Sequence, residues 1–298
     1  MRSLLTAPPL RLVAALAVFL ALAWPGRSEG QASPPPTAAG RAPLFVGFGP
    51  TDARLEVTLD TRLGFPDGSL RVGEGGNHGT RLRLADDLGL DVSEAVEASL
   101  AFHLTPRDAV RVTGLYYFLD NSATFREAIR YNDDTFGPGH IHANADFYRL
   151  SLAYERLLLD GYGMLLTGTA GLTYVHLEPK LSSRGRGSRE DFYRDELPVP
   201  IAGLRIEIPL GERFAARASL AGGGIPAVDS LRKEGGTVHL SQIHVDGGLA
   251  VTYALARNAL LEAGYNYTYF FQHETSSKED NLFELSDSGF RLGLSFAY

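Results

Sequence analysis

The side chains best suited to chemistry are histidines that stand close to acids. His140 and His142 precede Asp146, and His244 precedes Asp246. Two residues separated by one share a face of a strand, so the side chains of each group could point to the same place. Imidazole nitrogens and carboxylate oxygens are ligands that suit a metal ion. No third ligand stands at a fixed spacing from either group. We therefore expect ordinary histidines at a rim or inside the fold, and predict no metal site and no cofactor.

An enzyme of this size would need acids or a serine placed against a histidine. The adjacent acids at 86–87 and 133–134 would diverge on a strand, because neighbouring side chains point to opposite faces. A lipid hydrolase would need a histidine and a serine paired on a lipid-facing strand, and the sequence shows no such pair. We predict that the chain is not an enzyme, with a hydrolase of lipid A or of peptides as an alternative.

A basic island stands out in a chain whose formal net charge is −7. It contains Arg184, Arg186 and Arg189, in a predicted loop. Arginines form charge-assisted hydrogen bonds with phosphates, so these three are candidates for contact with lipopolysaccharide. The alternative is a solvated loop tip. The overall negative charge argues against a nucleic-acid partner, which would require a basic surface.

The elements that must position these groups are strands, because apolar and polar residues alternate from about Ala53 onward. The last ten residues are the clearest case. Their apolar face should point to lipid and carry the signal that barrel-assembly machinery reads. It contains Phe290, Leu292, Leu294, Phe296 and Tyr298.

The opposite faces of these strands carry many ionisable residues, which parity assigns to the inside of a barrel. Inside a narrow barrel such charges must pair or meet water. We predict a charge network that fills the lumen, with a narrow path for small solutes as the alternative. Its members are Glu56, Asp60, Arg62, Glu97, His103, Arg111, Arg149, Arg205, Glu207, Arg217, His244, Asp246, Glu262 and Arg291.

Short and long connections alternate along the chain. Short turns fall at 105–108, 159–161, 211–213 and 256–258, whereas 66–93, 126–139, 181–191, 225–236 and 276–281 are long and polar. Long connections at one end and short ones at the other are typical of outer-membrane barrels. The sequence predicts an all-β, antiparallel, up-and-down transmembrane barrel of about ten strands, with eight possible.

The N-terminal part predicts export. Arg2 and Arg11 precede an apolar run at 12–22 that is too short for a comfortable transmembrane helix, and small residues follow. We assign 1–32 to a cleaved signal peptide, with cleavage near 23 or 32, 33–52 to a disordered proline-rich linker, and 53–298 to the barrel. With no cysteine, disulfides and a lipid-modified cysteine are excluded.

The closing segment from Gly289 to Tyr298, taken with the loop alternation and the signal, resembles small bacterial outer-membrane barrels of the OmpA and OmpW class. A weaker likeness, carried by Gly79-Thr80-Arg81, Asp86 to Asp91 and Thr105-Pro106-Arg107, is to proteobacterial barrels without a characterised activity. The resemblance implies location in the outer membrane of a Gram-negative bacterium, lipid and lipopolysaccharide as surroundings, and assembly by the barrel machinery. It implies a structural or surface-interaction role and no particular activity.

Overall fold

Long antiparallel strands make up nearly all of the described chain. The computed structural model describes residues 53–74, 78–161, 163–183, 186–189, 197–229, 239–276 and 279–298. The expected signal peptide and linker therefore lie outside the described residues. The strands are β1 (Leu55–Arg71), β2 (Leu82–Arg83), β3 (Ser93–Thr105), β4 (Asp108–Phe125), β5 (Ile129–Tyr131), β6 (Asp134–Phe136), β7 (Gly139–Gly161), β8 (Met164–Ser183), β9 (Arg186–Arg189), β10 (Val199–Pro209), β11 (Phe214–Asp229), β12 (His239–Ala256), β13 (Ala259–Thr275) and β14 (Asp280–Ala297).

The strands close into a barrel. Within the described part of the chain, ten of them form a continuous ring in the order β1, β3, β4, β7, β8, β10, β11, β12, β13 and β14. The ring closes where β14 pairs with β1, for example Leu292 with Thr61. The predicted antiparallel transmembrane barrel of about ten strands is confirmed. In the described residues, no helix is long and apolar enough to cross a membrane.

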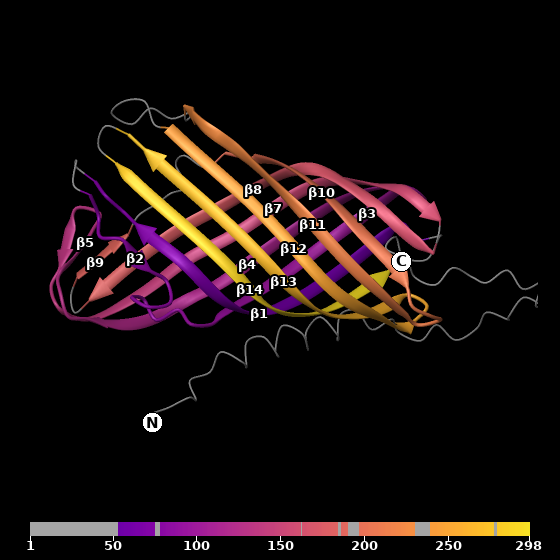
Figure 1. Ribbon diagram of the computed structural model, residues 1–298, viewed down its shortest axis with the longest axis horizontal. Coiled ribbons are helices and arrows are strands. Elements are labelled where there is room, and N and C mark those ends of the chain that lie inside the picture. The colour runs from indigo at the N-terminus through magenta and orange to yellow at the C-terminus, as the bar shows by residue number, and fades with distance from the viewer. Residues whose placement is uncertain are drawn as a thin grey trace, which may run out of the picture.

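The two ends of the barrel differ, as predicted. Tight turns join β3 to β4, β7 to β8, β10 to β11 and β12 to β13 at the end where the chain terminates, whereas β2, β5 and β9 gather at the opposite end (Figure 1). By the rule for such barrels, the end with tight turns is periplasmic and the other is the outer end. β7 has 23 residues, whereas a membrane-spanning strand needs only about 9–11. The outer half of the barrel therefore stands beyond the membrane.

We call the half of the barrel that carries the tight turns the inner half. Its outward side chains are apolar and its inward side chains are polar. On β7, Leu150 and Leu152 point outward and are 51% and 54% exposed, with Tyr148 and Tyr154 flanking them. Aromatic residues flanking an apolar band are the girdle that marks the two membrane interfaces. Other exposed apolar residues of this band are Leu63, Leu100, Val112, Leu172, Leu204, Ile206, Leu220, Leu249, Val251, Phe290 and Leu292.

In the outer half, the inward side chains are apolar and the outward side chains are polar. The alternation of inward and outward residues along each strand continues unchanged. On β4, Leu115 and Tyr117 continue the inward face that begins with Arg111, yet they are apolar and buried. The outward face continues from Phe118 to the exposed Asp120. This is the pattern of a water-soluble β-barrel, because here water rather than lipid covers the outside.

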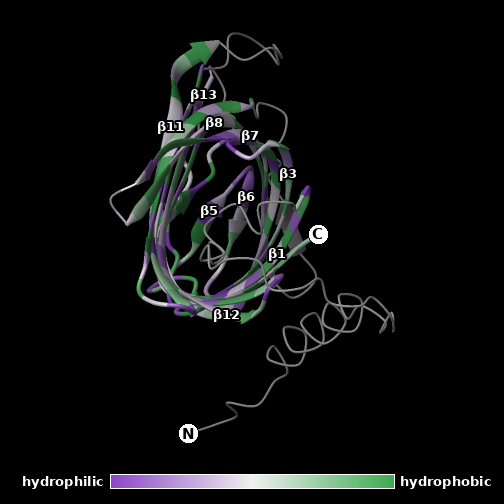
Figure 2. Ribbon diagram, turned by 90° about the vertical axis from the view of Figure 1, so that its right-hand side faces the viewer, coloured by the Kyte–Doolittle hydropathy of each residue, from purple (hydrophilic) through white to green (hydrophobic). Residues whose placement is uncertain are grey.

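The inside of the outer half is filled by two loops. The segment after β1 folds into the mouth, and the β5–β6 hairpin lies within the ring of strands (Figure 2). The Tyr131 hydroxyl donates to the carbonyl of Pro179 on β8 at 2.7 Å, and the Thr80 amide donates to the carbonyl of Arg130 at 2.8 Å. We call these two segments the plug. Its buried apolar residues are Val72, Leu82, Leu84, Leu88, Leu90, Ile129, Tyr131 and Phe136.

Two details of the first loop differ from the prediction. β1 continues through Pro66 to Arg71, because the outer extension of the barrel keeps this segment paired with β14. The loop that follows is not a solvated outer loop, since its leucines are buried in the plug. The apolar interior of the outer half made burial more favourable than exposure for these side chains.

Candidate functional site

A ring of alternating charges lines the lumen in the half of the barrel that carries the tight turns. Glu155 on β7 is its centre, since its carboxylate receives Arg111 Nε at 3.0 Å and Arg205 NH1 at 3.2 Å. Arg111 also reaches Glu56 at 3.1 Å. From Arg205 the pairs continue around the wall and return to β1. In order, this inner charge ring is Glu56, Arg111, Glu155, Arg205, Glu207, Arg217, Glu262, Arg291 and Asp60.

A second set of charges crosses the lumen. Arg149 on β7 reaches Asp246 on β12 at 2.5 Å, although β8, β10 and β11 stand between these strands in the ring. Arg62 pairs with Glu97 at 2.5 Å, and Thr268 donates to Asp246 at 2.9 Å. We call this set the crossbar. It joins β7 to β12 across the lumen and narrows the lumen at this level.

An aromatic layer lies directly outside the crossbar. Phe147 on β7 packs against Phe270 on β13, with ring centroids 5.3 Å apart, and four strands separate these two on either side of the ring. Tyr117 and Phe283 extend the layer. The ring of His244 packs at a tilt against Phe270, with centroids 4.8 Å apart, and His244 is only 2% exposed. Side chains from diametrically opposite walls therefore touch, and the plug begins above them.

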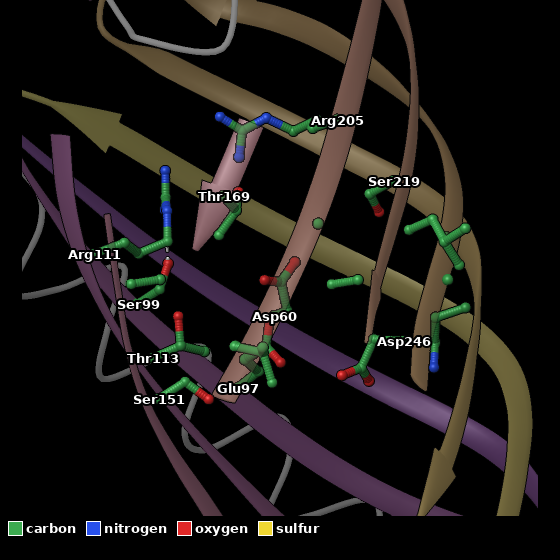
Figure 3. A pocket seen from close by; sticks show the side chains of 18 of the residues that line it. Asp60, Glu97, Ser99, Arg111, Thr113, Ser151, Thr169, Arg205, Ser219 and Asp246 are labelled. Carbon is green, nitrogen blue, oxygen red and sulfur yellow. Dashed lines mark hydrogen bonds between the residues drawn. The ribbon is translucent and has the colours of Figure 1, made fainter. Parts of the chain in front are cut away.

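A polar chamber of about 250 Å³ remains beside the charges. Figure 3 shows Arg111, Arg205 and Asp246 directed toward it from different strands. Its space is left by small residues on β10 to β12, among them Gly203 and Gly248. The amide of Asn266 lines the chamber without a partner among the described side chains. Walls of this kind hold water, so we expect the chamber to be wet.

Every residue predicted for the lumen network lies on the inner face, but the members play different roles. Twelve belong to the ring or the crossbar, whereas His103 lies 3.9 Å from Glu56 and His244 belongs to the aromatic layer. The sequence analysis missed Glu155, which meets two arginines of the ring. The signal was present, because Glu155 shares the parity of Arg149 on the same strand.

The outer rim carries a smaller cluster around Asp280. Its carboxylate accepts from Arg71 at 2.6 Å, from His273 at 3.1 Å and from His78 at 3.3 Å. Burial alone would raise the pKa of Asp280, but the hydrogen bond from His273 and the charge of Arg71 outweigh it and hold the pKa below the ordinary 3.8. The cluster ties the segment after β1 to β13 and β14.

Two predicted sets remain: the closing strand, which is fully described, and the basic island, which is described only in part. On the closing strand, Phe290, Leu292 and Tyr298 are exposed on the outward face, Phe296 is half-buried and Leu294 is buried. In the basic island, Arg184 lies outside the described residues. Arg186 and Arg189 are the ends of β9, and only their backbone is described.

The outer wall contains a pairing that the sequence analysis did not consider, because its partners are on different strands. Ser122 on β4 lies opposite His142 on β7, and the Ser122 hydroxyl oxygen is 3.1 Å from His142 Nδ1. Among the described residues, no group of three or more histidines and acids is arranged to hold a metal ion.

No protein-family profile and no curated protein matches the sequence. Solved structures do resemble the fold. The outer-membrane protease OmpT of Escherichia coli has a TM-score of 0.48 and 14% identity, over 82% of this chain and 97% of that one. The translocator domain of the autotransporter NalP of Neisseria meningitidis has a TM-score of 0.41 and 15% identity, over 85% of this chain and 91% of that one. Ail of Yersinia pestis has a TM-score of 0.27 and 11% identity, over 80% of this chain and 99% of that one.

Proposed function

We propose that this chain is an integral outer-membrane barrel with a closed lumen, whose role is structural or depends on its outward surfaces. The observation that carries the proposal is closure at three successive levels. The crossbar joins β7 to β12, the aromatic layer joins β7 to β13, and the plug fills the outer mouth. Each level alone would block a solute wider than water.

The apolar band on the outside supports the membrane location. Residues such as Leu150, Leu204 and Leu249 are more than half exposed, a cost that lipid removes because no water is present to be ordered around them. Export through the signal peptide, insertion by the barrel-assembly machinery through the face of Phe290 to Tyr298, and a lipopolysaccharide contact at Arg184, Arg186 and Arg189 belong to the same proposal.

Planar-bilayer recording of the purified full chain tests the closed lumen. We expect a quiet baseline, because the crossbar and the aromatic layer are held by packing from opposite walls. A matched open control is the same preparation to which a known porin has been added. Discrete, reproducible conductance steps from the protein alone would contradict a closed barrel and support the alternative of a narrow channel, to which the 250 Å³ polar chamber would then belong.

A further inference from the structure

Three side chains on the outer wall are arranged like the parts of an activated nucleophile. The hydroxyl of Ser122 is 3.1 Å from His142 Nδ1. On the other side of the same imidazole, Nε2 is 3.6 Å from the carboxylate of Asp120. A hydroxyl next to a base that is itself oriented by a third group is the arrangement of nucleophilic catalysis, and it is recognised by geometry rather than by order in the chain.

The sheet itself creates this arrangement. Asp120 and Ser122 are two residues apart on β4, so they share the outward face, and register places His142 of β7 opposite Ser122. Ser122 and Asp120 are exposed, and the His142 side chain is 45% exposed. The group is therefore open to a substrate from outside the barrel.

Its height on the wall indicates what that substrate is. Below it on the same two strands lie the outward aromatics Tyr116, Phe118 and Tyr148, which mark the outer membrane interface. Ser122 follows Phe118 by four residues, which is about 13 Å along a tilted strand. The group therefore faces the hydrated headgroup zone of the outer leaflet, just beyond the aromatic residues at the interface.

We propose that Ser122, His142 and Asp120 form a hydrolase site that cleaves acyl esters of lipids in the outer leaflet. Ser122 Oγ attacks the ester carbonyl carbon while His142 Nδ1 accepts its proton. The bond to the leaving alcohol then breaks, and His142 returns the proton to that alcohol. Water, activated by His142, hydrolyses the acyl-serine and releases a fatty acid, so one ester and one water give one alcohol and one acid.

Asp120 acts as a positioning residue. Its carboxylate lies on the Nε2 side of the ring, where it orients the imidazole and stabilises the imidazolium that forms. Polar donors continue on the same face, since register places Asn144 opposite Asp120 and Lys180 opposite Asn144. These donors, one and two strands away from β4, are available to a substrate that binds across this face. This site does not depend on the closed lumen, because it lies on the other side of the wall.

The nucleophile is tested with the full chain folded in detergent micelles, using a fluorophosphonate probe and a p-nitrophenyl ester. We expect covalent labelling of the wild type, and a loss of labelling and of hydrolysis by at least about 100-fold in Ser122→Ala and His142→Ala. The matched controls are Ser286→Ala, an outward serine bonded to Tyr267, and His140→Ala, an exposed histidine on the same face of β7. Both should behave as the wild type.

Migration on a gel before and after boiling shows whether each variant is folded. Equal labelling of folded wild type and folded Ser122→Ala, or no labelling of either, would overturn the proposal. For Asp120, we expect Asp120→Asn to lower kcat while KM is unchanged, and Asp120→Glu to recover part of the rate. A merely structural role would change neither constant in this selective way.

The source of the ester is tested by release of fatty acid from two kinds of vesicle, one of phospholipid and one that also contains lipid A. Release from the first kind of vesicle would show that the substrate is a glycerol ester of a phospholipid. Release from the second kind alone would show that the substrate is an acyl ester of lipid A. Hydrolysis of the soluble ester without release from either vesicle would keep Ser122 as a nucleophile and overturn the lipid substrate.

Discussion

At the scale of residues, Glu155 shows how the lumen balances its charges. It is 4% exposed and lies between two arginines, with Nε of Arg111 at 3.0 Å and NH1 of Arg205 at 3.2 Å. A buried carboxylate is tolerated only when its attraction to such partners offsets the loss of hydration. The polar chamber beside it gives the same charges access to water, which reduces the cost on both sides.

Replacement of Glu155 by alanine should destabilise the barrel. Two buried arginines lose a shared partner, and breaking such a pair costs about 3 kcal/mol at a dry site and less at a wet one. Urea unfolding in lipid vesicles measures the change. Glu212→Ala, in an exposed turn, is the matched control and should be neutral. Equal midpoints for the two variants would show that the inner charge ring does not hold the barrel together.

At the scale of elements, the β5–β6 hairpin is held in the mouth by apolar contacts and by a few hydrogen bonds to the wall. Phe136 is 2% exposed and Tyr131 is completely buried, and the latter donates to the carbonyl of Pro179. A three-residue strand pair is not stable alone in water, so its position depends on this packing.

Truncation of Phe136 tests that dependence. Phe136→Ala should lower the free energy of unfolding by about 3 kcal/mol, since a buried aromatic ring is lost and a cavity remains. Hydrogen exchange should also become faster in 129–136 than elsewhere. The control is Phe118→Ala, which removes the same ring from the exposed outward face of β4. Protection of 129–136 that is unchanged in Phe136→Ala would contradict a packed plug.

The Asp280 cluster should make the outer rim sensitive to acid. Because the folded state holds the pKa of Asp280 below 3.8, its contribution is fully present above that value and is lost as the pH falls through the folded pKa. The charged or titratable groups that face it are Arg71, His78 and His273.

Limited proteolysis of the segment after β1 at a series of pH values measures the effect, with an acid-stable protease. We expect cleavage to begin below about pH 4 in the wild type, whereas Asp280→Asn should be cleaved at all pH values. If the variant and the wild type give the same pH profile, this cluster does not fasten the segment.

At the scale of the whole molecule, closure is distributed over levels that depend on different forces. The crossbar is electrostatic, whereas the aromatic layer and the plug are apolar. A disturbance of one level therefore leaves the others in place. The inner half is adapted to lipid outside and charge inside, and the outer half to water outside and an apolar core inside.

This arrangement predicts that one change will not open the barrel. Phe125 and Gly139 are paired in register, so residues 126–138 can be replaced by an Asn-Gly turn. That variant should remain silent in planar bilayers, because Arg149 still meets Asp246 and Phe147 still meets Phe270. The same deletion combined with Arg149→Ala and Phe147→Ala should conduct, because we expect the segment after β1 not to fill the mouth without the hairpin. Conductance after the deletion alone would mean that the β5–β6 hairpin is the sole barrier.

The sequence by itself determined the architecture. Alternation with a period of two identified the strands and sorted side chains such as Glu97, Arg205 and Glu262 onto one face, because that period follows from backbone geometry alone. The alternation of long and short connections predicted about ten strands. It also predicted that the last strand ends on the side of the short turns. These signals are local in sequence, and no knowledge of distant contacts is needed to use them.

Only the tertiary structure decided what each face meets. Leu115 and Tyr117 share the face of Arg111, and parity cannot say that their surroundings change from charge to an apolar core where the barrel leaves the membrane. Pairing across the lumen and between strands was equally hidden. Arg149 and Asp246 are 97 residues apart, and Ser122 and His142 are 20 apart on two strands. Register and closure brought them together, because contacts between strands are fixed by the whole sheet and not by local spacing.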